Sequence, residues 1–493
     1  MRTSKEYSLC ETFTLGTSGK GFAPLKYVST RGEAPVLGFD DVLLAGLATD
    51  GGLYVPESWP TLPAADLKSM KGMRYEEAAF KVMRPFIGGV IPDEDLFHII
   101  ENAYTSFDTS TPAPLRDLGD GLWMTELFHG PTLAFKDVAM QFLGGVFDYV
   151  LKQRGEQITI VGATSGDTGS AAIEAVRGKD AIDIFMLHPE GRVSDVQRRQ
   201  MTSVMDDNVH NIAVAGTFDD CQDLVKAAFN NPAFRKRHRL SAVNSINWAR
   251  VMAQMVYYVT TSADLGAPGN AVAYSVPTGN FGNVFAGYGA SRMGVPISQL
   301  LVASNRNDIL TRFFSTGAMT MGEVFATLSP SMDIQVSSNF ERLLFELCQR
   351  DGAKVAATMQ AFRDSGRYDI AEDALREARA LFDGACYDDD QTTTEMRRHF
   401  DETGEQIDPH TAVALAAARE HRRDPSIPMV VLATAHPAKF GKAVELATGL
   451  APALPDKVAD LMTRNEKCST LANDLVALEN FIDGQQGQDR GAV

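Results

Sequence analysis

One lysine in this 493-residue chain stands in a sequence that could change its chemistry. Lys136 directly follows Leu133, Ala134 and Phe135 in the run HGPTLAFKD, residues 129–137. An apolar surrounding disfavours the ammonium ion, so it lowers the pKa of the amine and frees the nucleophile that Schiff-base chemistry needs. For an arbitrary lysine, the commoner explanation is a helix-start side chain that carries its charge out to water. The rest of the chain favours the nucleophile.

Two other segments combine a short apolar strand with a loop of small polar residues and an amphipathic helix. Residues 158–161 lead into GATSGDTGSAA (162–172), which offers backbone N–H groups and hydroxyls at a helix start and suits a carboxylate or a phosphate. Residues 271–276 lead into PTGNFGN (277–283), where two glycines let the backbone close around a phosphate without a Cβ in the way.

A third segment of this kind lies near the C-terminus. Residues 429–433 lead into TAHPAKFGKA (434–443), so Thr434 stands at the carboxyl end of an expected strand, where ligands bind in open α/β sheets. Any one of these loops could be a simple turn. Together with the Lys136 run, they indicate a shared ligand site.

The four strings HGPTLAFKD, ATSGDTG, SVPTGNFGN and ATAHPAKF, in this order, resemble those of threonine synthases. That family belongs to the fold-type II pyridoxal-phosphate enzymes related to the tryptophan synthase β subunit. The resemblance includes KYVSTRG (26–32) and DGGLYVP (50–56), two strings that look particular to threonine synthases, and runs from about residue 26 to about residue 450. HGPT is closer to the form with the longer, fungal-like N-terminal region.

The resemblance implies pyridoxal 5'-phosphate as the cofactor and assigns a part to each loop. Lys136 would hold the cofactor as a Schiff base and then act as the general base at the α and β carbons of the substrate. Thr434 would meet the pyridine nitrogen, and a hydroxyl there leaves that nitrogen largely uncharged. The cofactor phosphate would be bound through the backbone N–H groups of Gly279, Asn280, Phe281, Gly282 and Asn283.

The expected substrate-binding residues form two groups. The substrate carboxylate would be bound by Thr164, Ser165, Gly166, Asp167 and Thr168. Asp167 would repel a carboxylate, so orienting a neighbour and facing the substrate ammonium are the alternatives for it.

The distal phosphate would be met at the expected helix start NSINWAR by Asn244, Ser245, Asn247 and Arg250. Arg250 is the best cation available, although a helix cap with a solvated arginine explains these residues equally well. A histidine side chain ordinarily titrates near neutral pH, so His129 and His436 could carry protons, but a histidine beside such a turn is more often structural. No HxxxH or HExxH spacing indicates a metal, so we expect none.

The alternation of strands and helices around these loops predicts an α/β fold with parallel sheets flanked by helices and an N-terminal helical subdomain. The resemblance implies that this fold is of type II. Residues 138–150 repeat apolar side chains at three- and four-residue spacing, which predicts a buried helix that fixes Lys136. We expect this division of the chain: 1–25 outside the fold, as a tag or a misplaced start; 26–110 a mostly helical subdomain, with helices near 39–47, 75–87 and 93–104; 111–155 and 240–478 the main cofactor-binding α/β domain; 156–239 a smaller mobile α/β domain with the substrate loop; and 479–493 a polar tail that frays.

Composition argues against other classes of function. The formal net charge of −17 disfavours nucleic-acid binding, which relies on clustered Lys and Arg. No apolar run approaches the ~20 residues that span a bilayer, so we expect no membrane association. The five cysteines are scattered and odd in number, which favours free thiols in the cytoplasm over disulfides or a zinc site. The chain could be a monomer or a homodimer.

The resemblance implies a PLP-dependent lyase that converts O-phospho-L-homoserine and water into L-threonine and phosphate. The reaction is a γ-elimination followed by addition of water at Cβ, and it is the last step of threonine biosynthesis. One alternative is a threonine-synthase-like phospholyase, which releases phosphate without adding water. Another is an inactive fold of the same type that serves as a binding module, and the intact lysine and loops argue against it.

Overall fold

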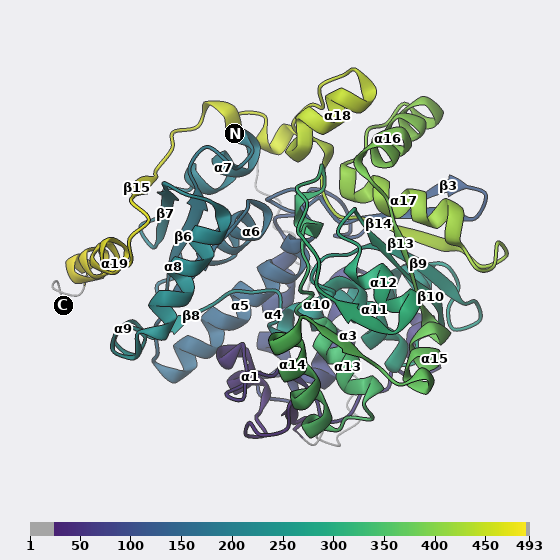
Figure 1. Ribbon diagram of the computed structural model, residues 1–493, viewed down its shortest axis with the longest axis horizontal. Helices are drawn as coiled ribbons and strands as arrows, with labels where there is room; N and C mark the ends of the chain where they lie inside the picture. Colours follow the sequence, from purple (N-terminus) through teal and green to yellow (C-terminus); the bar gives the residue numbers. More distant parts are fainter. Residues whose placement is uncertain (1–23, 490–493) are drawn as a thin grey trace, which may run out of the picture.

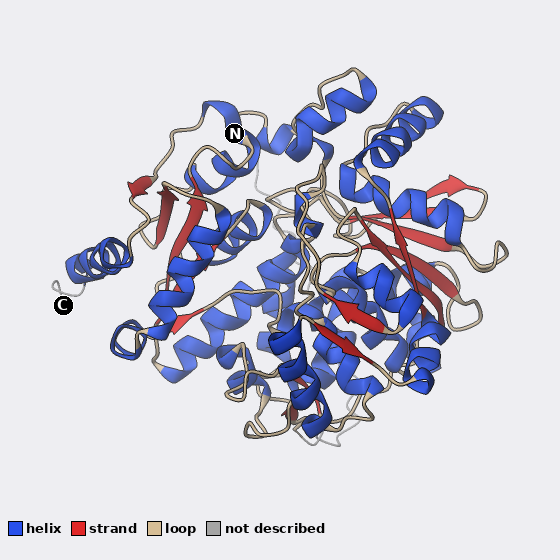
Figure 2. Ribbon diagram, in the orientation of Figure 1, coloured by secondary structure: helices blue, strands red, loops and turns tan. Residues whose placement is uncertain are grey.

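The computed structural model describes residues 24–489. The segment 1–25, expected to lie outside the fold, falls outside this range except for its last two residues. Within the described range the strands form a six-stranded sheet, a five-stranded sheet and two two-stranded sheets. Figure 2 shows the two larger sheets as separate groups of strands with helices packed around them. No described helix combines the length and the hydropathy that crossing a bilayer requires.

The N-terminal region is largely helical. Its helices α3 and α4 have the predicted bounds, because buried side chains recur every three or four residues and α3 ends at Gly88, which has a left-handed conformation (φ 64°). The elements are β1 (Tyr27–Ser29), α1 (Phe39–Ala45), β2 (Tyr54–Pro56), α2 (Ala64–Ser69), α3 (Tyr75–Ile87) and α4 (Asp93–Tyr104).

The six-stranded sheet has the order β13-β10-β9-β14-β4-β3, and its pairs are parallel except for β3 with β4. Every residue of β9 and β14 is buried, which fits continuous apolar runs with helices on both faces. Its strands are β3 (Leu115–Gly119), β4 (Leu122–Glu126), β9 (Val272–Pro277), β10 (Ile297–Ser304), β13 (Phe382–Cys386) and β14 (Met429–Ala433).

The helices and minor elements of this larger part follow. They are α5 (Lys136–Arg154), α10 (Trp248–Asp264), α11 (Gly282–Arg292), α12 (Ile309–Thr316), β11 (Ala318–Thr320), η1 (Pro330–Met332), α13 (Phe340–Leu347), α14 (Gly352–Ser365), β12 (Arg367–Asp369), α15 (Glu372–Leu381), α16 (Asp389–Thr403), α17 (Pro409–His421), η2 (Pro437–Phe440), α18 (Gly441–Thr448), η3 (Asp456–Val458) and η4 (Leu461–Thr463).

The five-stranded sheet is parallel throughout, in the order β15-β7-β6-β5-β8. Two of its strands, β8 and β15, come from outside the range 156–239 expected for the smaller unit. Its elements are β5 (Ile158–Ala163), α6 (Asp167–Val176), β6 (Ile182–Pro189), α7 (Asp195–Thr202), β7 (Val209–Val214), α8 (Phe218–Asn230), α9 (Pro232–His238), β8 (Leu240–Ser241), β15 (Ser469–Leu471) and α19 (Leu475–Asp489).

The prediction of a fraying tail after residue 479 is wrong as far as residue 489. This stretch belongs to α19, which packs against α8. Leu478 and Ile482 are buried, and Gln486 donates hydrogen bonds to Thr159 and Asp183. The apolar pair at i and i+4 gives the helix a buried face that its polar composition concealed.

The loops that carry the predicted motifs follow the carboxyl ends of β5, β9 and β14. In Figure 1, α5 lies between the two larger sheets, and it packs against α6 on one side and α10 on the other. The fold therefore brings these loops together around the N-terminus of α5.

Candidate active site

Lys136 is the first residue of α5 and is held there by the segment that follows β14. The backbone N–H of Phe135 donates to the Thr434 carbonyl at 2.8 Å, and the N–H of His436 donates to the Leu133 carbonyl at 3.0 Å. Leu133 has a left-handed conformation (φ 61°), which turns the chain into the helix. This pairing places two predicted cofactor residues, Lys136 and Thr434, beside each other.

The amine of Lys136 is buried, with 9% of the residue exposed. Its Nζ lies 4.8 Å from the centre of the Phe135 ring and donates to Asp167 Oδ2 at 3.3 Å. Burial lowers the pKa of Lys136; Asp167 opposes this effect, while the nearby cations Lys439 and Arg250 add to it. A larger share of uncharged amine follows, as nucleophilic chemistry requires.

Asp167, the first residue of α6, lies between two lysines. Burial alone would raise the pKa of its carboxyl, but Lys439 and Lys136 hold it well below its usual range. Lys439 Nζ lies 3.0 Å from Oδ1, Gln197 Nε2 donates to Oδ1 at 2.8 Å, and Ser331 Oγ donates to Oδ2 at 3.3 Å. The carboxylate is therefore ionised and turned toward the Lys136 amine.

The rest of the 164–168 loop is a tight turn. The Thr164 hydroxyl accepts hydrogen bonds from the N–H groups of Gly166 and Gly169, both at 2.9 Å, so it serves the turn itself. Gly166 has φ 139°, and a Cβ there would lie 2.5 Å from the Gln197 side chain. Ser165 is exposed and Thr168 is half-buried.

The loop after β9 is held by the segment 331–339. The Gly279 carbonyl accepts from Ser337 Oγ at 2.8 Å, and the Asn280 carbonyl accepts from the backbone and side chain of Asn339 at 3.0 and 2.9 Å. A Cβ on Gly279 would lie 2.6 Å from a backbone oxygen, so this position requires glycine.

The end of this loop starts α11 and presents a free donor. Phe281 has a left-handed conformation (φ 62°) and packs its ring in an aromatic cluster with Phe340. Asn283 Oδ1 accepts from the hydroxyls of Tyr257 and Tyr258 at 2.6 and 3.0 Å, whereas its buried Nδ2 has no partner in residues 24–486. An unpaired buried amide is costly, so this group suits a bound acceptor.

The helix α10 begins with the predicted NSINWAR segment. Asn247 is an N-cap: Oδ1 accepts from the Ala249 N–H at 3.0 Å and Nδ2 donates to the Leu43 carbonyl at 2.9 Å, so its amide is engaged within the fold. Asn244 Oδ1 accepts from the N–H of Ile246, and the Ser245 carbonyl accepts from Asn339.

Arg250 differs from these residues because its charge is unpaired. It is 4% exposed, and Nε and Nη1 have no hydrogen-bond partner among the described side chains and backbone. Burial lowers its pKa to about 10. A buried guanidinium without an acceptor favours an anionic ligand. With Asn283 and the glycine loop, it fits a cofactor and a substrate that both carry phosphate.

Comparison with known proteins agrees with this site. Residues 108–434 match the family model described as pyridoxal-phosphate dependent enzyme, residues 26–104 match that for the threonine synthase N terminus, and residues 411–482 match that for the threonine synthase C-terminal part. Threonine synthase from Pseudomonas aeruginosa is 55% identical over 94% of this chain and 100% of its own length. The chain belongs to the threonine synthase family.

Solved structures of the family are similar throughout their length. A PLP-bound threonine synthase from Brucella melitensis has a TM-score of 0.92 and 52% identity, over 94% of this chain and 99% of its own. Threonine synthase from yeast has a TM-score of 0.89 and 39% identity, over 94% and 99% of the two chains. The predicted type II fold is confirmed, and the chain is a PLP-dependent enzyme.

The two histidines singled out in the sequence have different surroundings in this threonine synthase family member. His129 lies between carboxylates, with Nε2 2.8 Å from Glu126 and Nδ1 3.5 Å from Asp108. His436 is the N-cap of η2: its Nδ1 accepts from the Ala438 N–H at 3.2 Å, and burial lowers its pKa to about 4. Both side chains therefore make contacts within the fold.

Three residues around Asp167 were not singled out in the sequence: Lys439, Gln197 and Ser331. Lys439 had a signal, since it follows Pro and Ala in ATAHPAKF much as Lys136 follows apolar residues in HGPTLAFKD. Gln197 and Ser331 come from α7 and η1 and carry no local pattern. Only the tertiary fold brings them to the carboxylate.

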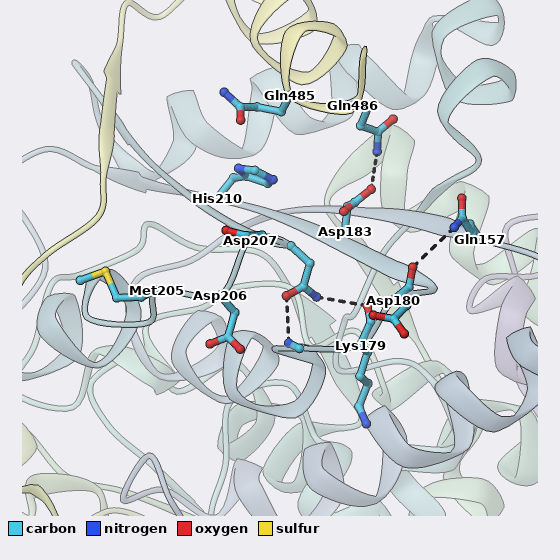
Figure 3. A pocket seen from close by; sticks show the side chains of 12 residues that line it. Gln157, Lys179, Asp180, Asp183, Met205, Asp206, Asp207, His210, Gln485 and Gln486 are labelled. Carbon is cyan, nitrogen blue, oxygen red and sulfur yellow. Dashed lines mark hydrogen bonds between the residues drawn. The ribbon is translucent and has the colours of Figure 1, made fainter. Parts of the chain in front are cut away.

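An open cleft of about 510 Å³ lies far from these loops in the fold, at the amino ends of β5, β6 and β7 (Figure 3). It is polar, with Asp180 and Asp206 among its lining residues, and contains none of the predicted site residues. Within the described part of the chain, no three His, Cys, Asp or Glu side chains converge in a way that could hold a metal.

Proposed function

We propose that this chain converts O-phospho-L-homoserine and water into L-threonine and phosphate, the last step of threonine biosynthesis. One observation carries the proposal: the buried amine of Lys136 lies near Arg250, a buried cation without an acceptor, and Asn283 at the end of the loop after β9 holds a second buried donor without a partner among the described residues. A reaction of a phosphorylated substrate with a phosphorylated cofactor needs a nucleophilic amine and two anion sites.

We infer that two residues and one loop hold the cofactor as the sequence predicts. Lys136 binds it covalently through its amine, and the backbone of the loop from Gly279 to Asn283 surrounds its phosphate, with Asn283 Nδ2 as an added donor. The Thr434 hydroxyl would contact the pyridine nitrogen of the cofactor. When bound, pyridoxal phosphate supplies an electron sink for the charge that develops on the substrate carbons. Lys136, once released, takes and returns protons at those carbons.

The substrate residues remain assigned in two groups. Backbone N–H groups and hydroxyls of the 164–168 loop bind the carboxylate, and Ser165 and Thr168 have the free hydroxyls there. Arg250, with Asn244 and Ser245 at the same helix start, binds the distal phosphate. Asn247 supports this group through its capping bonds. Asp167 does not bind the carboxylate in this scheme, because it faces Lys136 and Lys439.

The cellular setting is part of the proposal. We place the enzyme in the cytoplasm, and support comes from Cys221, Cys348, Cys386 and Cys468, which are free thiols. A monomer or a homodimer remains the expected assembly, and light scattering of the purified protein distinguishes them.

Product identification tests the function. The purified protein, loaded with pyridoxal phosphate, is supplied with O-phosphohomoserine, and the amino-acid product and the released phosphate are both measured. We expect L-threonine and phosphate in equal amounts, and neither with Lys136→Ala. Phosphate release with a product that lacks a hydroxyl at Cβ would instead identify a phospholyase.

A further inference from the structure

Two buried lysines share one carboxylate at the centre of the site. Lys136 and Lys439 are 9% and 1% exposed, and their Nζ atoms lie 3.3 and 3.0 Å from opposite oxygens of Asp167. A buried ammonium is costly unless it is paired. This arrangement sets two ammonium ions against one carboxylate. We therefore ask whether the two lysines have different roles.

Lys439 is fixed by three elements. Besides Asp167, its Nζ donates to the Thr132 carbonyl at 2.6 Å and to Gln200 Oε1 at 3.1 Å. Three acceptors match the three N–H groups of an ammonium ion. Thr132 is itself held, because its N–H and hydroxyl donate to Asp137 at 2.8 and 2.6 Å. Lys439 therefore has the surroundings of a permanent ammonium.

Lys136 has looser surroundings. Within residues 24–486, Asp167 is the hydrogen-bond acceptor recorded for its amine. The role proposed above requires this amine to give up its proton before it can attack the cofactor as a nucleophile. Asp167 then loses one of its two cations, and a buried carboxylate without a cation takes up a proton.

Resting on the proposed function, we propose that Lys439 is a positioning residue: it is the permanent counterion that keeps Asp167 ionised and in place while the Lys136 amine changes between its charged, neutral and cofactor-bound forms. Lys439 does not touch the reacting atoms in this account. It acts through Asp167 and through its own charge.

The charged and polar groups around the pair agree with this role. Lys136, on α5, faces Asp167 of α6, which raises its pKa, and Lys439 of η2 and Arg250 of α10, which lower it. Asp167 faces the same two lysines, Gln197 of α7, Ser331 of η1 and His410 of α17. Lys439 also acts on Asp137 of α5: burial raises the pKa of this carboxyl to about 6, and Lys439 opposes the rise. When the charge at position 439 is removed, Lys136 is the one of these two lysines left to pair with Asp167. The pKa of the Lys136 amine should therefore rise.

The test follows the reactivity of Lys136 in the full-length protein after removal of the cofactor. Methylation of Lys136 by formaldehyde and cyanoborohydride is measured by peptide mass mapping across pH, and the rate of cofactor reloading is measured from its absorbance across the same pH range. The variants are Lys439→Met and Lys439→Gln, which remove the charge, and Lys439→Arg, which keeps it. Lys442→Met is the matched control, because Lys442 is an exposed lysine three residues away.

We expect both pH midpoints to rise by about one unit or more in the neutral variants, as for loss of a nearby like charge. Lys439→Arg and Lys442→Met should keep the parental midpoints. If Lys439→Met does not fold, Lys439→Gln carries the test, since its amide can retain the bonds to Thr132 and Asp167. A parental midpoint in Lys439→Gln, or an equal rise in Lys439→Arg, would overturn the proposal.

Failure of the proposed function gives a different result. In that case the cofactor would not protect Lys136 from methylation in the parent protein. Protection in the parent with an unchanged midpoint in Lys439→Gln would overturn the role of Lys439 alone.

Discussion

Arg342 and Arg250 are both buried guanidinium groups, but they have opposite surroundings. Arg342 is fully buried and donates to the Tyr54 carbonyl at 3.0 and 3.1 Å, to the Ile246 carbonyl at 2.6 Å and to Asn339 Oδ1. Arg250 has two unpaired nitrogens. Burial lowers the pKa of Arg342 to about 9 and that of Arg250 to about 10.

The difference separates a cation that serves the fold from one that we propose binds a ligand. Arg342 joins the N-terminal region, through Tyr54, to the start of α10 and to Asn339, which holds the loop after β9. The hydrogen bonds of Arg342 thereby link the N-terminal region to both loops that are proposed to bind phosphate. Nε and Nη1 of Arg250 have no hydrogen-bond partner within the described structure, so we propose that a ligand explains its burial.

Loss of Arg342 should have the largest effect on stability. Arg342→Met leaves buried carbonyl oxygens without donors, each at a cost of about 1–3 kcal/mol, so the free energy of unfolding should fall by about 3 kcal/mol or more. Urea unfolding measures this change. A loss below about 1 kcal/mol would show that the three segments hold their positions without Arg342.

Loss of Arg250 should instead affect catalysis. Arg250→Met keeps the apolar stem and removes an uncompensated charge, so the urea midpoint should stay the same or rise. The kcat/KM for O-phosphohomoserine should fall about 10- to 100-fold, since a charge-assisted hydrogen bond is lost. Binding of homoserine, which lacks the phosphate, should change little. An equal loss for both ligands would place Arg250 at the carboxylate or in the fold.

The glycine loop extends the comparison to the cofactor. A Cβ at Gly282 would lie 3.2 Å from Asn339 Nδ2, so Gly282→Val should push the loop away from the phosphate and weaken cofactor binding about tenfold or more. The control is Gly484→Val, because a Cβ at Gly484 meets nothing within 4 Å. Titration with pyridoxal phosphate measures both, and parental affinity in Gly282→Val would move the phosphate site elsewhere.

The smallest expected effect concerns His399, a buried side chain without a hydrogen-bond partner that no proposed ligand explains. It is 1% exposed, and neither ring nitrogen has a partner among the described residues. Burial, aided by Arg116 and Arg419, lowers its pKa to about 4 from an unfolded value near 6.5. Its contribution to stability is therefore full above pH 6.5 and is lost as the pH falls from about 6.5 to about 4.

His399→Leu should reduce the loss of stability across that pH range by the contribution of one proton. Urea unfolding at several pH values between 4 and 7 gives the slope for both proteins. An unchanged slope would mean that His399 finds a partner or takes up a proton in the folded protein.

The sequence predicts local features of this molecule better than contacts between residues that lie far apart in the chain. The helices at 75–87 and 93–104 and the strand at 429–433 were predictable because their apolar patterns lie within a dozen residues. Lys136 and Thr434 could be singled out as candidates because each follows a recognisable strand or turn. The contacts of Asp167 were not, since Lys439, Gln197 and Ser331 come from three distant elements. For the same reason β15 and α19 were not predicted: their apolar residues are covered only because β15 pairs with β7 and α19 packs against α8.

Covalent mapping of the cofactor tests the central claim most directly. The loaded protein is reduced with borohydride, digested and mapped by mass spectrometry. Two buried lysines flank Asp167, but the account assigns the reactive amine to Lys136 and a permanent charge to Lys439. We predict that the cofactor label appears on Lys136. A label on Lys439, or on any other lysine, would contradict the account.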